Sequence, residues 1–277
     1  MTASTPTTVT TTPTLKHQTP PPPVTYTIWW SNATFFVAVH ILAALGAYYY
    51  PWYTVNRASL ILCFLTWQAA CFSITIGYHR LYSHKTFKAA FPVRVLLAAL
   101  GASAFQGSIK WWALRHRLHH RFEDDPQHDP YCATEGMLWA HVGWIFYKRN
   151  YEKLEVIEKH DLESDIVVRT QHKYYLPFAI LAGFVFPIVM GMLWDDPVGS
   201  FIWAGLVSKI MIWHCTFMVN SLAHWNGLQP YSDDTTSVSN LICAMLTCGE
   251  GNHNFHVRSC FKLNYSTFLS FELTPSA

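Results

Sequence analysis

The sequence has little charge and no paired cysteines. Only 13% of its 277 residues are Asp, Glu, Lys or Arg, and the formal net charge is +2. So small a net charge gives no indication of a nucleic-acid partner. The seven cysteines are odd in number and include no CxxC pair. Most lie in apolar stretches, which is typical of small buried thiols in a reducing compartment.

The N-terminal residues lack the features of a secretory signal. Residues 1–27 are dominated by Thr and Pro, including the run from Pro20 to Pro23, and contain neither a basic segment nor an apolar one. A signal peptide needs both. We therefore expect a disordered tail over 1–27, followed by one domain over 28–256.

Apolar residues are abundant, at 51% hydrophobic and 16% aromatic, which favours a membrane protein. Four segments approach the roughly 20 residues needed to cross a bilayer. The stretch from Phe91 to Phe105 is too short to cross and favours an interfacial or core helix. Pro177 and Pro187 leave a loop or re-entrant segment as the alternative for the third crossing, although membrane helices tolerate proline. The four predicted crossings are about 33–50, 58–77, 175–193 and 201–219.

Positive charge is concentrated in one block. Of the 19 Lys and Arg residues, 14 lie between Arg80 and Lys173, whereas the turn joining the last two crossings carries Asp195 and Asp196 and no cation. Because cytoplasmic loops are enriched in Lys and Arg, we expect this block and both termini on the cytosolic side. The sequence thus predicts an all-α membrane protein with four transmembrane helices and a cytosolic helical cap.

Eight of the fifteen histidines form four spaced clusters on or near the predicted cytosolic side. Imidazole is the commonest transition-metal ligand, and the scarcity of carboxylates and cysteine pairs around the clusters favours iron, copper or zinc over calcium or magnesium. In HRLHH the three histidines are spaced i, i+3 and i+4, so they share one helix face. The clusters are His79 and His84; His116, His119 and His120; His224; and His253 and His256.

The spacing within the other clusters predicts local geometry. His79 and His84 are five residues apart, about 140 degrees on a regular α-helix, so we expect the second crossing to end or unwind between them. Asn220 and His224 are four apart and can face one site. The alternative, interfacial histidines satisfied by lipid headgroups, is disfavoured by eight histidines in four clusters. The other seven have no partner spacing and indicate ordinary structural roles: His17, His40, His128, His141, His160, His172 and His214.

The segments HRLYSH, HRLHHRFEDDPQHDPY, VNSLAHWNG and GEGNHNFH closely resemble those of membrane fatty acyl-CoA delta-9 desaturases, the stearoyl-CoA desaturase family. The similarity runs from about Tyr26 to His256. The six-residue spacing HxxxxH of the first segment favours desaturases over related membrane hydroxylases. The resemblance implies oxygen-dependent insertion of a cis double bond at the delta-9 position of stearoyl- or palmitoyl-CoA, in the endoplasmic reticulum membrane.

The resemblance also implies the cofactors and their ligands. Two irons would be held by the eight clustered histidines, with Asn220 holding a water on one iron and a ninth ligand falling on Val257. Oxygen would be the co-substrate, and electrons would come from cytochrome b5 and its reductase. The implied metal site is His79, His84, His116, His119, His120, Asn220, His224, His253 and His256.

Substrate-binding positions follow from the same resemblance. An acyl tunnel would pass Gln106, Trp112 and Thr216 near its bend, with Trp67 and Cys71 near its end. An apolar tube is the natural host for an unactivated acyl chain. The alternative for each of these five residues is ordinary core packing.

The resemblance also implies three basic residues as candidate contacts for coenzyme A. Lys148 and Arg149 would meet the phosphates of coenzyme A, and Arg115 is a weaker candidate. Contact with anionic lipid headgroups is the alternative for these cations.

The similarity stops after His256, where residues 257–277 depart from the family pattern. Because a valine codon begins with the dinucleotide that opens most introns, we expect an unspliced intron or a mistaken gene structure at Val257. The alternative is a genuinely divergent end, and we expect no cytochrome b5 domain within these residues. Two rival functions remain: an inactive truncated desaturase or membrane scaffold, and a metal transporter. The transporter is disfavoured because its ligands should lie near the bilayer midplane.

Overall fold

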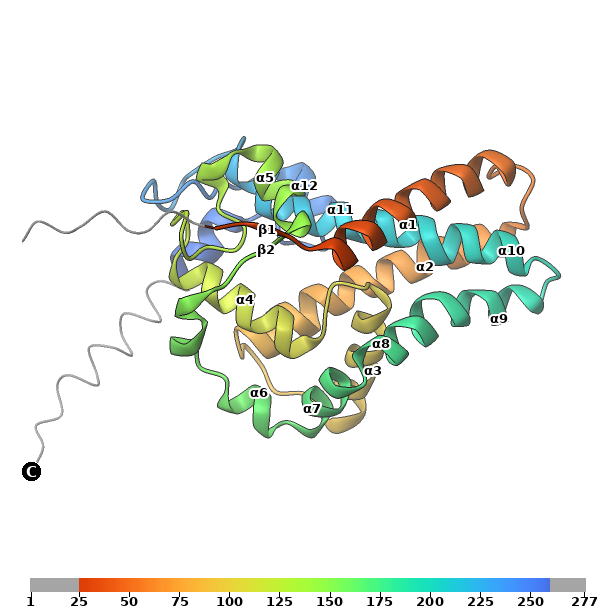
Figure 1. Cartoon of the computed structure of the whole chain (residues 1–277), viewed down its shortest axis with the longest axis horizontal. Helices are drawn as coiled ribbons and strands as arrows, with labels where there is room; N and C mark the ends of the chain where they lie inside the picture. The colour runs from red at the N-terminus through yellow and green to blue at the C-terminus, as the bar shows by residue number, and fades with distance from the viewer. Residues whose placement is uncertain (1–24, 260–277) are drawn as a thin grey trace, which may run out of the picture.

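The computed structural model describes residues 25–259, so most of the expected tail and residues 260–277 lie outside the described part. Within it the chain is mostly helical, and its only strands, β1 and β2, pair over two residues each. The helices form a long bundle at one end and a cap of shorter elements at the other (Figure 1). This confirms the predicted all-α class with four apolar helices long enough to cross a membrane.

The four long helices are built from consecutive elements. Three of them arise from joined segments that change between α and π geometry without a break, and the third crossing is a continuous helix rather than the alternative loop. The elements are α1 (Trp30–Tyr49); α2 (Arg57–Phe72) with η1 (Ser73–Ser83); α8 (Tyr175–Ile180), η5 (Leu181–Val185) and α9 (Phe186–Met192); and α10 (Pro197–Ser200), η6 (Phe201–Val207), α11 (Ser208–Ser221) and η7 (Leu222–His224).

The cap contains the remaining elements and the loops that join them, and together these carry most of the charged residues. The apolar helix α3 (Phe91–Ser103) is too short to count among the spanning helices, as expected from the sequence. The other cap elements are β1 (Thr27–Ile28), α4 (Ile109–Arg121), η2 (Ala133–Glu135), α5 (Met137–His141), η3 (Gly143–Phe146), β2 (Tyr147–Lys148), η4 (Glu152–Val156), α6 (His160–Ser164), α7 (Ile166–Lys173) and α12 (Leu241–Leu246). Residues 253–259 are also helical.

Polar side chains fix the end of the bundle farthest from the cap. Asp196 accepts hydrogen bonds from the hydroxyl of Ser59 at 2.7 Å and from the backbone N–H of Asn56 at 3.0 Å. The side chain of Asn56 in turn caps α2 by accepting from Ala58 N at 2.9 Å. These contacts hold the two inter-helix turns together.

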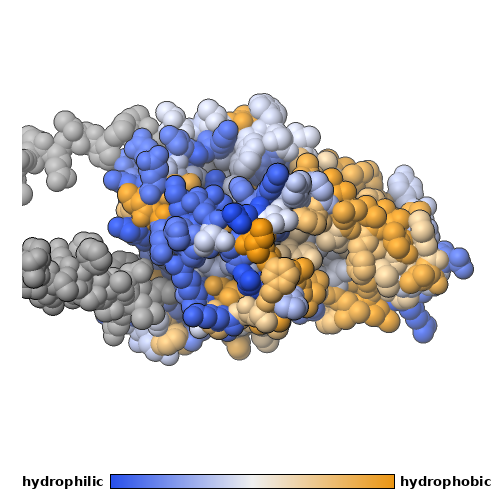
Figure 2. All heavy atoms as spheres, turned by 90° about the horizontal axis from the view of Figure 1, so that it is seen from below, coloured by the Kyte–Doolittle hydropathy of each residue, from blue (hydrophilic) through white to orange (hydrophobic). Residues whose placement is uncertain are grey.

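The crossings expose apolar side chains that a soluble protein would bury. Leu42, Phe64 and Leu181 are each more than half exposed. Hydrophobic residues cover the bundle in the face shown in Figure 2, whereas hydrophilic residues cover much of the cap. Such a continuous apolar surface fits burial in lipid.

Close packing joins the second crossing to the cap. A Cβ added at Gly101 in α3 would lie 2.3 Å from Cε1 of Tyr78, so only glycine permits this approach. Tyr78 is fully buried, and its hydroxyl accepts a hydrogen bond from Gln171 at 2.7 Å. The Gln171 carbonyl oxygen accepts from the N–H of Ile109, the first residue of α4. This chain of contacts sets α4 against the end of the second crossing.

Candidate metal centre

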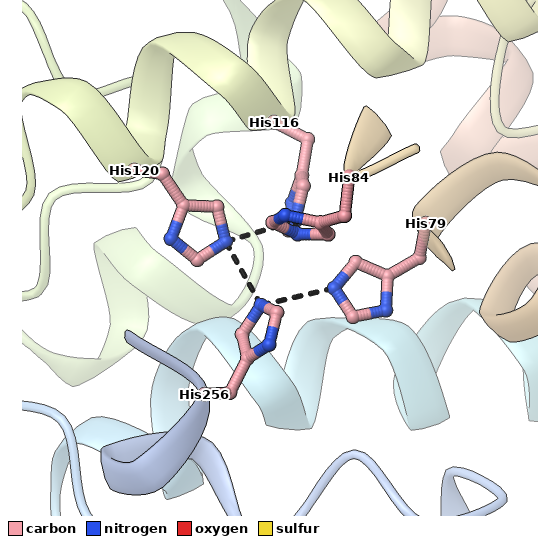
Figure 3. A group of neighbouring side chains, drawn as sticks. All are labelled: His79, His84, His116, His120 and His256. Atoms are coloured by element: carbon pink, nitrogen blue, oxygen red, sulfur yellow. Dashed lines mark hydrogen bonds between the residues drawn. The ribbon is translucent and has the colours of Figure 1, made fainter. Parts of the chain in front are cut away.

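Five histidines from three regions of the chain converge in the cap to form the first histidine cluster (Figure 3). One ligand nitrogen from each lies within 4.8 Å of all the others. They come from the end of the second crossing, from α4 and from the helical residues 253–259. The members are His79, His84, His116, His120 and His256.

A π-helix brings His79 and His84 together. The N–H of His84 donates to the carbonyl of His79 at 3.0 Å, an i to i+5 bond, and the two ring centroids lie 4.6 Å apart. As expected, the crossing ends between them: its last helical residue is Ser83, and His84 is the C-cap. The wider π turn places residues five apart on nearly the same face, so the two imidazoles lie side by side.

The first cluster fits a metal ion. Its Nε2 atoms lie 3.0 Å apart between His79 and His256, 3.0 Å between His256 and His120, 3.0 Å between His120 and His116, and 2.9 Å between His116 and His84. A six-coordinate ion with bonds of about 2.1 Å holds adjacent ligand atoms about 3 Å apart. Five imidazoles at this spacing could hold one ion and leave one position open.

Burial keeps members of this cluster in the form that binds metal. Burial, assisted by neighbouring histidine charges, lowers the pKa of His84 to about 3. The same causes hold the pKa values of His116 and His120 well below the usual range. These imidazoles are therefore neutral at pH 7, and a neutral imidazole offers its lone pair to a cation.

A second group of ligand atoms lies beside the first and includes a carboxylate that the histidine motifs did not predict. His119, His224, His253 and Glu123 each place one ligand atom within 4.8 Å of the others. Both ring nitrogens of His253, Nε2 of His224 and both carboxylate oxygens of Glu123 are buried and have no hydrogen-bond partner among the described residues. Buried polar atoms without partners are costly, and a metal ion would satisfy several of them at once.

Hydrogen bonds fix the orientation of two histidines in the second group. Thr236 donates its only hydroxyl proton to Asp124 at 2.7 Å, so it must accept from Nδ1 of His224, 2.9 Å away. The lone pair of neutral His224 is therefore on Nε2, the atom without a partner. Nδ1 of His119 lies 2.8 Å from Asp129 Oδ1 in the same kind of arrangement. Such partners orient the histidines of metal sites.

Charge in this second group differs from that in the first. Burial acts to lower the pKa of His119, but the charge and hydrogen bond of Asp129 outweigh burial and raise this pKa to about 9. Burial raises the pKa of Glu123 to about 8. In the first cluster, the carboxylate of Glu250 lies 3.0 Å from Nδ1 of His79.

Two apolar cavities meet beneath the clusters. The larger is about 370 Å³ and the smaller about 50 Å³. Both are lined by Trp112, His116, Thr216 and Asn220, so the wall they share contains a member of the first cluster. Asn220, on α11, lines both cavities.

The residues expected to line a tunnel separate into two sets. Gln106 lines the larger cavity and donates to Thr216 Oγ1 at 2.8 Å, and Cys71 lines the smaller cavity. Trp67 packs against the core and lines neither of these two cavities.

The three basic residues expected to contact coenzyme A differ in exposure and in their partners. Lys148 is exposed on β2. The Arg149 side chain is only 2% exposed and is held by Glu135 at 3.3 Å. Arg115 stacks on Trp111, with its guanidinium carbon 3.9 Å from the ring centroid. Lys148 is thus the best placed of the three to meet a ligand in solution.

Three histidines without partner spacing form a chain outside the metal clusters. Nε2 of His40 lies 3.1 Å from Nε2 of His214, whose Nδ1 lies 2.9 Å from Nε2 of His141. The sequence assigned these residues ordinary structural roles, and they link α1, α11 and α5. No local pattern could reveal the chain because its members are far apart in sequence.

Comparison with known proteins decides the family. The family model described as fatty acid desaturase matches residues 51–256. The chain belongs to the fatty acid desaturase family. The resemblance drawn from the histidine motifs is thereby confirmed, and with four apolar helices this family member is a multi-pass membrane protein.

Individual relatives support the same assignment. The chain is 39% identical over 228 residues to the probable acyl-CoA desaturase of Schizosaccharomyces pombe, covering 82% of this chain and 47% of the relative. It is 41% identical over 185 residues to acyl-CoA desaturase 1 of Saccharomyces cerevisiae, covering 66% and 36%. It is 36% identical over 234 residues to the delta(9)-fatty-acid desaturase fat-6 of Caenorhabditis elegans, covering 83% and 68%. The chain thus spans less than half the length of the two yeast relatives.

Proposed function

We propose that the chain is an oxygen-dependent acyl-CoA desaturase that forms a cis double bond at the delta-9 position of stearoyl- or palmitoyl-CoA. The observation that carries the proposal is the pair of apolar cavities that meet at His116, a member of the first histidine cluster. An acyl chain threaded from the larger cavity into the smaller one would pass directly beside the metal ligands.

The proposed cofactor is a pair of iron ions. His79, His84, His116, His120 and His256 would hold one ion, and His119, His224 and His253 would hold the other, with Asn220 facing the site from α11. The chemistry supplied by bound iron is activation of oxygen and removal of one hydrogen atom from each of two adjacent methylenes. Overall, O2, two electrons and two protons would convert the CH2–CH2 unit into a double bond and two waters.

The chain's own residues supply binding and alignment. Apolar walls exclude water from the acyl chain, and the Gln106–Thr216 hydrogen bond braces the segment before α4 against α11 where the cavities meet. The position of the double bond then depends on how far the thioester anchor lies from the metal ligands. Cys71 in the smaller cavity and Trp67 on the same helix would limit chain length, and Lys148 and Arg149 would meet coenzyme A phosphates.

Electron supply and location complete the proposal. Cytochrome b5 and its reductase would deliver electrons in trans, and the protein would reside in the endoplasmic reticulum membrane. The cap, which holds most of the cations, would face the cytosol, because positively charged segments are retained on that side.

Fatty-acid profiling of cells that lack their own desaturase tests this function. The chain would be expressed as printed and with Val257→His plus a family-type tail, and His116→Ala in each background serves as the matched control. Delta-9 unsaturated products that disappear in the control are expected. If neither form yields unsaturated product while both accumulate in the membrane, the enzyme proposal is overturned in favour of an inactive scaffold.

A further inference from the structure

Glu123 has a buried side chain in the cap, and the proposed function assigns it no role. Its side chain is 1% exposed, and neither carboxylate oxygen has a hydrogen-bond partner among the described residues. A buried carboxylate without a hydrogen bond or a paired cation is costly. A metal ion bound beside Glu123 would give these oxygens a partner and offset this cost.

The surroundings of Glu123 supply the other donors for a cation. Its carboxylate belongs to the same set of close ligand atoms as His119, His224 and His253. Glu123 Oε1 lies 3.8 Å from Nδ1 of His224, too far for a hydrogen bond. His224 and His253 both retain ring nitrogens without partners. One ion among these four side chains would satisfy unpartnered atoms on three of them.

The loop that carries Glu123 is fixed rather than loose. Asp124 adopts a φ of 64° just after it, and its backbone N–H donates to Asp129 Oδ2 at 3.1 Å. The Asp124 carboxylate accepts from both the N–H and the hydroxyl of Thr236, each at 2.7 Å. Thr236 is also the residue that orients His224. Asp124 and Thr236 therefore position both the Glu123 carboxylate and the His224 imidazole.

We infer that Glu123 is a metal ligand, giving the second site a three-histidine, one-carboxylate donor set. This inference rests on the proposed function and deepens it, because the two metals would then differ in ligand charge: five neutral imidazoles at one site, and three imidazoles with one carboxylate at the other. The family resemblance implies a ninth ligand at position 257, where this chain has the buried Val257, and Glu123 takes that role here.

Metal content of purified variants tests the assignment. The full chain, its Glu123→Gln variant and an Asp125→Asn control would be loaded anaerobically with Fe(II) and assayed for iron per chain. Asp125 is a matched control because it lies in the same loop and outside both ligand groups. We expect about two irons in the wild type and in the control, and about one in Glu123→Gln. The second iron's affinity should fall by more than the roughly 10- to 100-fold typical for loss of an outer-shell partner.

Three outcomes would overturn the inference: a Glu123→Gln variant that binds two irons as tightly as the wild type, a control that loses iron equally, or a wild type that binds fewer than two. If the variant does not fold, the iron-loaded wild type decides the question by cryo-electron microscopy. A Glu123 oxygen about 2.0–2.2 Å from the second metal is expected, and a carboxylate beyond bonding distance contradicts the assignment. Two bound irons with no desaturated product would refute the proposed activity and leave the ligand assignment standing.

Discussion

The guanidinium of Arg117 forms a two-pronged ion pair with Asp161, with Nη1 3.0 Å from Oδ1 and Nη2 2.6 Å from Oδ2. The same side chain donates to the backbone carbonyls of Tyr82, at 2.6 Å, and Ser83, at 3.1 Å. Arg117 lies between cluster residues on α4, and Ser83 directly precedes His84. The contact therefore holds two parts of the first histidine cluster in register with α6.

Replacing Arg117 by lysine should loosen this arrangement. Lysine keeps the charge but cannot make the forked set of hydrogen bonds. We expect Arg117→Lys to lower the free energy of unfolding by about 2 kcal/mol, typical for losing hydrogen bonds to a charged group, and to weaken iron loading. Thermal unfolding in detergent and iron content measure both effects. Arg121→Lys, an exposed change on the same helix, is the control and should alter neither.

Acid should weaken the same ion pair. Partial burial acts to raise the pKa of Asp161, but hydrogen bonds and charge from Arg117 outweigh it and hold this pKa below its ordinary value. A carboxyl with a lower pKa in the folded state stabilises the fold above its unfolded pKa, about 3.9. That stabilisation disappears as the pH falls through the folded pKa. Unfolding temperature should therefore drop less steeply below about pH 4 in Asp161→Asn than in the wild type, and parallel curves would contradict the prediction.

Asp129 should affect metal binding through His119. Its carboxylate orients His119 and is 1% exposed. Loss of such an outer-shell partner typically lowers metal affinity 10- to 100-fold, roughly. We expect Asp129→Asn to weaken binding of the second iron by about that factor, measured by competition with a chelator. Asp125→Asn provides the comparison, and equal losses in both variants would refute a specific role.

Cys71 should limit how long an acyl chain the smaller cavity accepts. Its side chain is 2% exposed and lines that cavity. Cys71→Leu should shift products from an 18-carbon toward a 16-carbon chain because the added bulk shortens the space available. Gas chromatography of products from expressing cells measures the ratio. Cys63→Leu adds the same bulk on α2 outside both cavities and should leave the ratio unchanged.

The chain of three histidines should contribute to stability and not to metal binding. His214→Phe keeps an aromatic ring but leaves Nε2 of both His40 and His141 without the contacts described above. Because these groups are only partly buried, we expect a loss near the lower end of the usual range, about 1 kcal/mol for each. His214→Gln, which keeps one donor and one acceptor, should lose less. A fall in iron content in either folded variant would contradict a purely structural role.

The sequence by itself determined the class of fold and most of the metal-binding residues. Long apolar segments must be helical in lipid because their backbone groups have no water to bond. The HRLHH spacing placed its histidines on one helix face, and α4 is helical through all of them. These properties are local, so residue type and spacing suffice to predict them.

Only the tertiary structure decided how the clusters divide and what supports them. HRLHH contributes to both groups, since His116 and His120 join the first and His119 joins the second. The π-helix at His79, the carboxylate of Glu123 and the orienting contact from Thr236 depend on segments far apart in the chain. Such contacts have no period in the sequence, because packing of the cap against α11 and the end of the second crossing selects them.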